Sequence, residues 1–111
     1  MAEGYSRLVS RQSGQCLDVS GESTEDGAPI VQWPCHGGAN QQWRLEAVGQ
    51  GYRLVARHSG KCLDVAGWST DDGTGIIQWQ CHGGANQTWL VRRRGPAPWT
   101  SANVGNVGAA G

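Results

Sequence analysis

The residues best equipped for chemistry form the same set twice, 46 positions apart. Each set has an aspartate, a tryptophan, a histidine and an asparagine–glutamine pair: Asp18, Trp33, His36, Asn40 and Gln41, then Asp64, Trp79, His82, Asn86 and Gln87. A carboxylate accepts hydrogen bonds from two hydroxyls, an amide donates and accepts, and an imidazole can do either. A tryptophan face suits a ring whose C–H bonds point at it. A pyranose needs both kinds of partner, so each set predicts a shallow sugar-binding site.

Structural explanations have to be weighed against a binding role for the members of the set. Asp18 lies within an expected strand, where aspartate is disfavoured, and this favours a binding role. Trp33 could pack between repeats instead of stacking on a ligand, and His36 could simply begin its loop. Gln41 could bond to the backbone at one end and to a ligand at the other. The same alternatives hold for the equivalent residues of the second set.

The two sets belong to two longer copies of one segment. Residues 7–49 and 53–95 align without a gap and agree at 27 positions. A unit this short cannot bury its apolar face alone, so repeats of this kind pack against one another. The 111-residue chain has room for about one domain. We therefore expect one domain over residues 1–95, with repeat one at 5–50 and repeat two at 51–95.

Short strands separated by turns should position these residues. In repeat one the expected strands are residues 5–10, 15–19, 29–35 and 41–45. Leu17 and Val19 alternate with polar positions, which is the period of a half-buried strand. Asp26 precedes a glycine and is expected to form a turn, while Trp43 and its equivalent Trp89 are expected in the core. Eighteen glycines and the absence of helical periodicity predict an all-β chain.

Charge and hydropathy argue against nucleic acid or a membrane as partner. The net charge is zero, and charged residues make up 16% of the chain. The run Arg92-Arg93-Arg94 is better explained as a solvated strand end than as a phosphate-binding patch. No segment approaches the roughly 20 apolar residues of a membrane span. The N-terminal residues lack the basic-then-apolar pattern of an export signal, and no residue pattern indicates a cofactor.

The cysteines form one pair in each repeat. They are Cys16, Cys35, Cys62 and Cys81. A disulfide within each repeat would close a loop of 20 residues, contribute about 3 kcal/mol in the chain-entropy model and imply an oxidising compartment. Free buried thiols are one alternative. A zinc site that adds His36 and His82 is another, although zinc ligands usually come in closely spaced pairs.

Residues 96–111 differ in composition from both repeats. This tail is rich in glycine and alanine and has Trp99 as its one aromatic residue. Such a segment cannot bury enough apolar area to offset the entropy lost on ordering. We therefore expect residues 96–111 to be a linker or a disordered end.

The repeated motifs resemble those of a known family. CLDV followed by a turn, then QW-x-C-H-G-G-A-N-Q-x-W, occurs in both copies and is similar to the ricin B-type lectin repeat, or QxW repeat. It is close to the carbohydrate-binding modules of family 13 that are attached to bacterial xylanases and other glycoside hydrolases. The resemblance covers residues 7 to about 94. It implies a β-trefoil in which each four-stranded repeat has its own disulfide, Cys16–Cys35 and Cys62–Cys81.

The resemblance also implies roles for the two sets of residues. The family's sugar-contacting aspartate falls on Asp18 and Asp64, and its stacking aromatic residue falls on Trp33 and Trp79. Its polar contacts fall on His36, Asn40 and Gln41 in the first copy, and on His82, Asn86 and Gln87 in the second. All these positions are suitably occupied, so the resemblance implies two competent sites.

One departure from the family pattern concerns the number of repeats. A complete trefoil of this family has three repeats, and this sequence shows two. Eight strands would leave unpaired edges and an open core. One hypothesis is that three two-repeat chains associate, because their six repeats are the number needed for two trefoils. The other is an open, marginal fold in a truncated or divergent chain.

Non-catalytic carbohydrate binding is the function that this sequence predicts. The expected ligands are galactose- or xylan-type glycans: a galactoside, an arabinoside or a xylo-oligosaccharide. The alternatives are a structural or partner-binding trefoil without sugar binding, and a module appended to a glycoside hydrolase. Catalysis is disfavoured, because the adjacent acidic pairs Glu25-Asp26 and Asp71-Asp72 cannot face one glycosidic bond from both sides. The family and the cysteines together predict an extracellular, multivalent protein.

Overall fold

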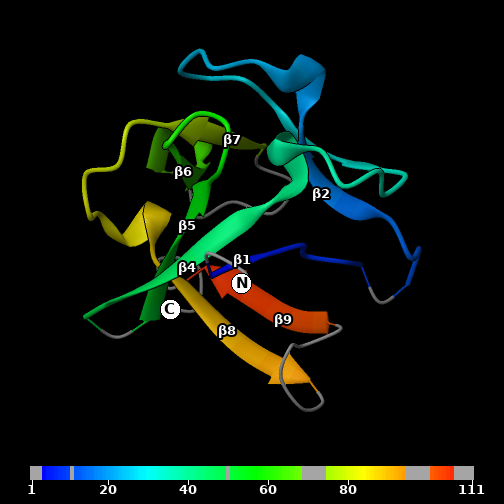
Figure 1. Ribbon diagram of the computed structural model, residues 1–111. Coiled ribbons are helices and arrows are strands. Elements are labelled where there is room, and N and C mark those ends of the chain that lie inside the picture. Colours follow the sequence, from blue (N-terminus) through cyan, green and yellow to red (C-terminus); the bar gives the residue numbers. More distant parts are fainter. Residues whose placement is uncertain (1–3, 11, 50, 69–74, 95–100, 107–111) are drawn as a thin grey trace.

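The computed structural model describes residues 4–10, 12–49, 51–68, 75–94 and 101–106. The regular elements in these ranges are short strands and single 3₁₀ turns (Figure 1), so the predicted all-β class is confirmed. The strands are β1 Tyr5–Ser6, β2 Cys16–Val19, β3 Ile30–Trp33, β4 Trp43–Val48, β5 Gly51–Ala56, β6 Cys62–Val65, β7 Ile76–Trp79, β8 Trp89–Arg94 and β9 Ser101–Asn106. The 3₁₀ turns are η1 Ser20–Glu22, η2 Ala39–Gln41, η3 Ala66–Trp68 and η4 Ala85–Gln87. None of the described helices is long and apolar enough to cross a membrane.

The strand pairing of repeat one recurs in repeat two at the same 46-residue spacing as the sequence repeat. β2 pairs antiparallel with β3, and β6 pairs with β7, in registers that differ only by the 46-residue offset. β1 pairs with β4 as β5 pairs with β8, so each copy forms a four-stranded lobe. The long β4–β5 hairpin joins the two lobes (Figure 1). The sequence repeat is therefore a structural repeat, with two lobes built to one plan.

The core lies between the two lobes and takes residues from both. Its buried members are Leu8, Val19, Ala28, Trp43, Leu54, Ala56, Leu63, Val65 and Trp89. The indole N–H of Trp43 donates to the carbonyl of Leu17 at 3.2 Å, and that of Trp89 donates to Leu63 at 3.0 Å. A phenylalanine would leave both carbonyls without this partner, because only the indole combines a large apolar body with a donor. The prediction that these two tryptophans belong to the core is confirmed.

Both cysteine pairs are disulfides within their own repeat. Cys16 is bonded to Cys35 and Cys62 to Cys81, with S–S distances of 2.01 and 2.00 Å. Each bond links the second strand of a lobe to the residues that follow its third strand. No cysteine is free, so the thiols are not available to a zinc ion, and the disulfide prediction is confirmed.

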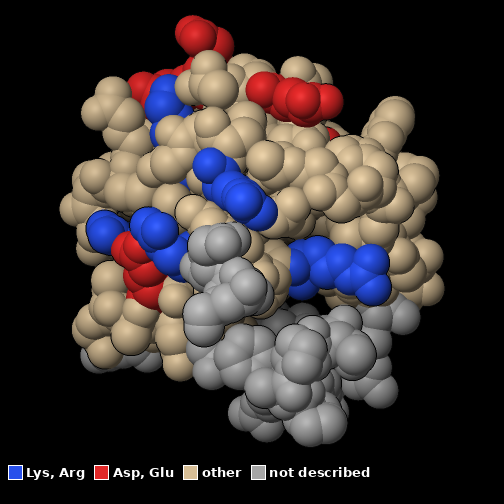
Figure 2. All heavy atoms as spheres, viewed as in Figure 1, with Lys and Arg blue, Asp and Glu red and all other residues tan. Residues whose placement is uncertain are grey.

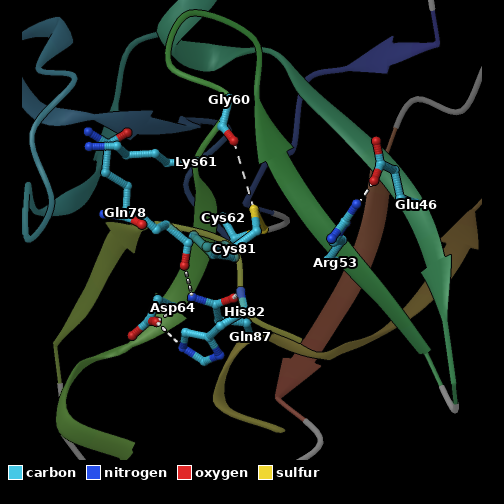
Figure 3. The surroundings of a disulfide bond; sticks show 12 residues. Glu46, Arg53, Gly60, Lys61, Cys62, Asp64, Gln78, Cys81, His82 and Gln87 are labelled. Atoms are coloured by element: carbon cyan, nitrogen blue, oxygen red, sulfur yellow. Dashed lines mark hydrogen bonds and ion pairs between the residues drawn. A yellow bond between two sulfur atoms is a disulfide. The ribbon is translucent and has the colours of Figure 1, made fainter. Parts of the chain in front are cut away.

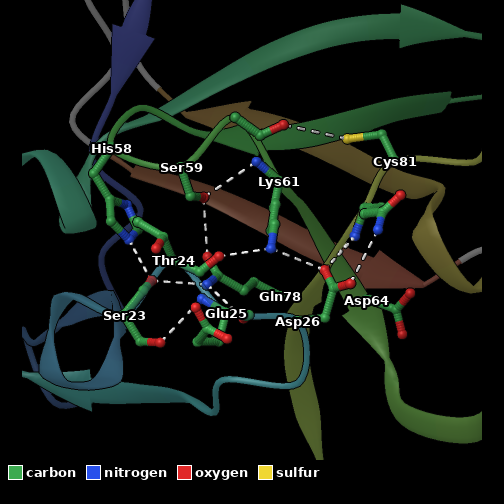
Figure 4. A network of polar contacts seen from close by, with 12 residues as sticks. Ser23, Thr24, Glu25, Asp26, His58, Ser59, Lys61, Asp64, Gln78 and Cys81 are labelled. Atoms are coloured by element: carbon green, nitrogen blue, oxygen red, sulfur yellow. Dashed lines mark hydrogen bonds and ion pairs between the residues drawn. The ribbon is translucent and has the colours of Figure 1, made fainter.

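A polar junction holds repeat one against repeat two (Figure 4). The turn around Asp26 lies on the edge of β7, where Gly27 donates its N–H to the carbonyl of Gln78 at 2.8 Å. The Asp26 carboxylate meets the Lys61 ammonium at 3.0 Å and accepts a hydrogen bond from the Gln80 backbone at 3.1 Å. The hydrogen bond from Lys61 lowers the pKa of Asp26 below its ordinary value. The sequence predicted a turn former at Asp26, and the structure adds an interface role.

The tail contains a strand that the sequence analysis did not predict. Ser101–Asn106 forms β9, which pairs antiparallel with β8 over six residue pairs, from Trp89↔Asn106 to Arg94↔Ser101. The expectation of disorder is therefore wrong for these residues. Strand pairing uses backbone N–H and C=O groups, so a glycine- and alanine-rich segment can pair without a large apolar side chain. Residues 96–100 and 107–111, including Trp99, lie outside the described residues.

Candidate functional site

The first candidate site is a pocket of about 460 Å³ over the β2–β3 pair. In the antiparallel register Asp18 lies opposite Val31, and Trp33 stands two residues further along the same face of β3. Asp18 is 4% exposed at the floor, whereas Trp33 is 56% exposed at the wall. A large exposed tryptophan beside a nearly buried carboxylate places an apolar face and a strong acceptor around one opening.

Gln41 lies beneath this pocket and holds its parts together. Its side chain is 1% exposed and donates from Nε2 to Asp18 Oδ2 at 2.7 Å and to the Pro34 carbonyl at 3.1 Å. Its Oε1 accepts the backbone N–H of His36 at 2.9 Å. One buried amide therefore connects the strand that carries the carboxylate to the loop that carries the imidazole. The structure gives Gln41 a supporting position and not a place on the pocket wall.

The His36 ring has a defined tautomer in its neutral form. Its Nδ1 accepts the backbone N–H of Gly38 at 3.0 Å, so the ring proton lies on Nε2. That nitrogen is 3.5 Å from Asp18 Oδ2, longer than a good N–H···O hydrogen bond. Gly38 permits this arrangement because a Cβ there would lie 2.6 Å from a ring carbon of His36. The pocket thus presents an N–H donor beside a carboxylate acceptor.

Asn40 lines the pocket but is itself nearly buried. It is 4% exposed, and its Nδ2 donates to the Val19 carbonyl at 3.1 Å. Its Oδ1 is buried and has no hydrogen-bond partner among the described residues. The structure therefore places Asn40 at the base of the pocket, where its amide also secures the end of β2.

The second pocket repeats this arrangement with a volume of about 300 Å³, and Figure 3 shows Asp64, His82 and the supporting Gln87. Gln87 donates to Asp64 Oδ2 at 2.7 Å and accepts the His82 backbone N–H at 2.9 Å. The Nε2 atom of His82 is 3.7 Å from Asp64 Oδ2. Trp79 is 41% exposed at the wall, and Asn86 is 5% exposed at the base. The agreement between the two pockets shows that the geometry follows from the shared residues.

The structure brings together most of the residues that the sequence singled out. Aspartate, tryptophan, histidine and asparagine line both pockets, whereas Gln41 and Gln87 lie below them. Sequence reasoning did not single out Val31 and its equivalent Ile77, which are also wall residues. Their alternation with the tryptophan two positions later could have revealed them. Among the described residues, no group of three or more His, Cys, Asp or Glu side chains is placed to hold a metal.

Comparison with known proteins identifies the family. The model of the "Ricin-type beta-trefoil lectin domain-like" family matches residues 1–79 and again residues 52–107. The chain belongs to this family. The two matches overlap because the family model fits the chain in two alignments that differ by about one repeat, as expected of a chain with internal repetition. The fold is a β-trefoil type with two of the usual three repeats.

Solved structures similar to this chain include members and designs of the same fold. The designed 3-fold symmetric protein ThreeFoil is 46% identical with a TM-score of 0.86, and the match covers 96% of this chain and 75% of that one. The exo-beta-1,3-galactanase 1,3Gal43A from Clostridium thermocellum is 45% identical, with a TM-score of 0.77 and coverages of 81% and 20%. The Macrolepiota procera ricin B-like lectin, solved with lactose, is 26% identical, with a TM-score of 0.67 and coverages of 85% and 63%.

The matched region is a small part of some of these relatives. The chain spans 7% of the length of the ribosome-inactivating protein PMRIPt from Polygonatum multiflorum and 18% of that of the probable lipoprotein EnvE from Salmonella typhimurium. The likeness therefore concerns one domain and not the whole of those proteins.

Proposed function

We propose that this protein is a non-catalytic carbohydrate-binding module with two equivalent sites for galactose- or xylan-type glycans. The observation that carries the proposal is the pairing, in both pockets, of an exposed tryptophan face with a nearly buried aspartate. A sugar ring offers an apolar C–H face and vicinal hydroxyls, and these two groups match them. The membership in a lectin-like family supports carbohydrate as the general ligand class.

Each side chain of the first pocket has a distinct role in the proposal. Trp33 stacks on the C–H face of the sugar, and Asp18 accepts hydrogen bonds from two neighbouring hydroxyls. The Nε2–H of His36 donates to a hydroxyl oxygen, because Nδ1 is occupied by the backbone. Asn40 closes the base of the pocket beneath the sugar, with its Nδ2 held by the Val19 carbonyl. Gln41 acts through Asp18, whose carboxylate it orients.

The surface charge agrees with an uncharged ligand. On the face shown in Figure 2, basic and acidic groups are few and lie among larger areas of uncharged side chains. The whole chain has no net charge. Stacking and hydrogen bonding act at short range, so a neutral sugar needs no long-range electrostatic attraction.

The galactanase and the lactose-bound lectin support galactosides as first ligands to test. The matched part of the galactanase is 20% of that enzyme, which is consistent with a binding module attached to a catalytic domain. For this chain a module of a glycoside hydrolase is therefore the second candidate function. Arabinosides and xylo-oligosaccharides remain in the proposed range.

A catalytic role for this domain itself is not part of the proposal. Hydrolysis of a glycosidic bond needs two carboxylates on opposite sides of that bond. Asp26, a candidate for such a pair, is held by Lys61 at the junction between the repeats. Asp64 is the one acidic side chain among the described residues of the second pocket. The design shared by the two pockets thus contains one carboxylate each.

We also propose an assembly and a compartment. Three two-repeat chains hold six lobes, enough for two three-lobed trefoils, and association would add the strength of multivalent binding. The disulfides within both repeats persist in oxidising surroundings, which supports an extracellular location.

Calorimetric titration with lactose, arabinose and a xylo-oligosaccharide tests the proposed function. We expect saturable binding of at least one of them with two sites per chain. Weak affinity is expected for each site because the pockets are open to water. Failure of all three to bind, with a native melting curve, would favour a structural trefoil without sugar binding.

A further inference from the structure

Repeat one exposes a face on its outer edge, and the equivalent face of repeat two is covered. We call the first the open face; it consists of Gln12, Ser13, Gln15 and Gln32. The equivalent residues of repeat two are His58, Ser59, Lys61 and Gln78. The turn Ser23–Gly27 lies on that second face, where Gln78 is 0% exposed. Gln32 is exposed, and no turn covers it in the part of the chain that the structure describes.

The Gln32 side chain is already oriented as its buried counterpart is. Ser13 donates from Oγ to Gln32 Oε1 at 2.6 Å, as Ser59 donates to Gln78 Oε1 at 3.0 Å. Because Ser13 holds the carbonyl end of the Gln32 side chain, the amide N–H groups of Gln32 point away from the turn that carries Ser13. In repeat two, the same groups of Gln78 donate to two backbone carbonyls of the docked turn, at 2.7 and 2.9 Å (Figure 4). The open face therefore presents the same two donors without their acceptors.

The backbone at Gln32 is open in the same way. Gln78 donates its N–H to the Ala28 carbonyl at 2.9 Å, outside its own hairpin. Gln32 has the same register in β3 as Gln78 has in β7, so its N–H and C=O also point away from the hairpin. No contact of this kind at Gln32 occurs among the described residues. An unpaired strand edge of this type is a template for another chain segment.

Strand β9 extends the other lobe by one strand, next to β8. β9 pairs with β8 as β5 pairs with β4, since Trp89↔Asn106 repeats Trp43↔Ala56. β9 thus stands where the first strand of a third lobe would stand. The turn that would cover the open face lies in each lobe between its second and third strands, which β9 does not supply.

We propose that the open face binds the turn of a lobe from a second copy of this chain. The covered face of repeat two shows what fits: a turn of sequence Ser-Thr-x-Asp-Gly, which occurs at residues 23–27 and, in sequence, at 69–73. A second copy presents its 23–27 turn by releasing it from its own repeat two. The incoming lobe also brings its own first strand to β8, in place of β9. The proposal rests on the three-chain association proposed above and names the surface responsible for it.

The contact between copies is weaker than the junction within one chain. At the internal junction Lys61 pairs with Asp26 at 3.0 Å. The open face has Gln15 at the position of Lys61, so the incoming aspartate meets an amide instead of an ammonium. Hydrogen bonds to charged groups are stronger than those between neutral groups. The association therefore depends on protein concentration.

Sedimentation velocity of the native chain and of Gln32→Glu over a wide concentration range tests the proposal. The substituted carboxylate keeps the bond from Ser13 but lacks the two N–H donors, and it faces carbonyl oxygens. We expect the native chain to reach a mass three times that of one chain. The variant should raise the dissociation constant at least tenfold and keep a native near-ultraviolet spectrum. The matched change Gln78→Glu should instead lower the melting temperature, because that residue is buried within one chain.

The possible results separate this inference from sugar binding. A native chain that stays monomeric, or a trimer that Gln32→Glu leaves intact, overturns the proposal even if lactose binds. Loss of association in Gln32→Glu supports it even if no sugar binds to either form. In the latter case the proposed sugar-binding function is contradicted and the docking surface is supported.

Discussion

Replacing Asp18 by asparagine should remove binding at the first proposed sugar site and leave the fold unchanged. Asparagine has the same shape as aspartate, and its side-chain oxygen can keep the 2.7 Å hydrogen bond from Gln41. Its amide nitrogen then takes the place of Oδ1, an atom with no protein partner among the described residues. A donor thus stands where the sugar hydroxyls need an acceptor, and the negative charge is lost.

The size of the effect follows from the hydrogen bonds involved. A hydrogen bond to a charged group contributes about 1.5 to 3 kcal/mol, and every 1.4 kcal/mol is about a tenfold change in affinity. Asp18→Asn should therefore raise the dissociation constant of its site by about 10- to 100-fold. The free energy of unfolding should change by less than about 1 kcal/mol, since shape and the main hydrogen bond are kept.

Titration calorimetry with lactose, followed by a thermal melt, measures both effects. Asp18→Asn should reduce the number of sites per chain from two to one, and the matched variant Asp64→Asn should do the same. The double variant should show no binding and a native melt. If either single variant abolishes binding at both pockets, the sites are not independent and the reasoning is refuted. Binding by the double variant at native strength would equally refute it.

Three further predictions concern the groups around the pockets. Gln41→Ala should lower the free energy of unfolding by about 2 to 4 kcal/mol in a denaturant titration, because it leaves buried polar groups unpaired; an unchanged midpoint would contradict this. Nitrogen NMR of the neutral His36 ring should show the proton on Nε2, and a proton on Nδ1 would contradict the Gly38 contact. Since the pKa of Asp26 is lowered by its hydrogen bond from Lys61, the unfolded chain binds more protons in acid, and stability falls as the pH drops below about 4. Asp26→Asn should therefore melt below the native chain at pH 7 but together with it in strong acid; an equal difference at both pH values would contradict the linkage.

Local patterns were enough to predict the architecture of each lobe. The strand signal around Leu17 and Val19 places β2, although the other face of this strand, with Cys16 and Asp18, is buried as well. The equal spacing of the cysteines indicates one disulfide per repeat. The tryptophans of the QxW motif are core residues, as expected, because a large apolar group with one donor suits a buried site next to a carbonyl. These features depend on residues close in sequence or repeated at a fixed distance.

The supporting contacts could not be predicted in this way. Gln41 was expected among the ligand contacts, yet it is buried and holds Asp18, 23 positions earlier. Strand β9 was missed because its stability comes from pairing with β8 and not from its own composition. Both results depend on which backbone groups lie opposite each other after the chain has folded.

The amino-acid sequence is sufficient to establish the family, the two lobes and most of the residues around each pocket, because these follow from a motif that occurs twice. The tertiary structure alone shows how the lobes differ. Gln32 and Gln78 are the same residue in the same register, but one is exposed and the other is fully buried. Their environments differ because, in the part of the chain that the structure describes, a neighbouring lobe covers only the second. Burial is a property of the assembled fold, and no local pattern in the chain records it.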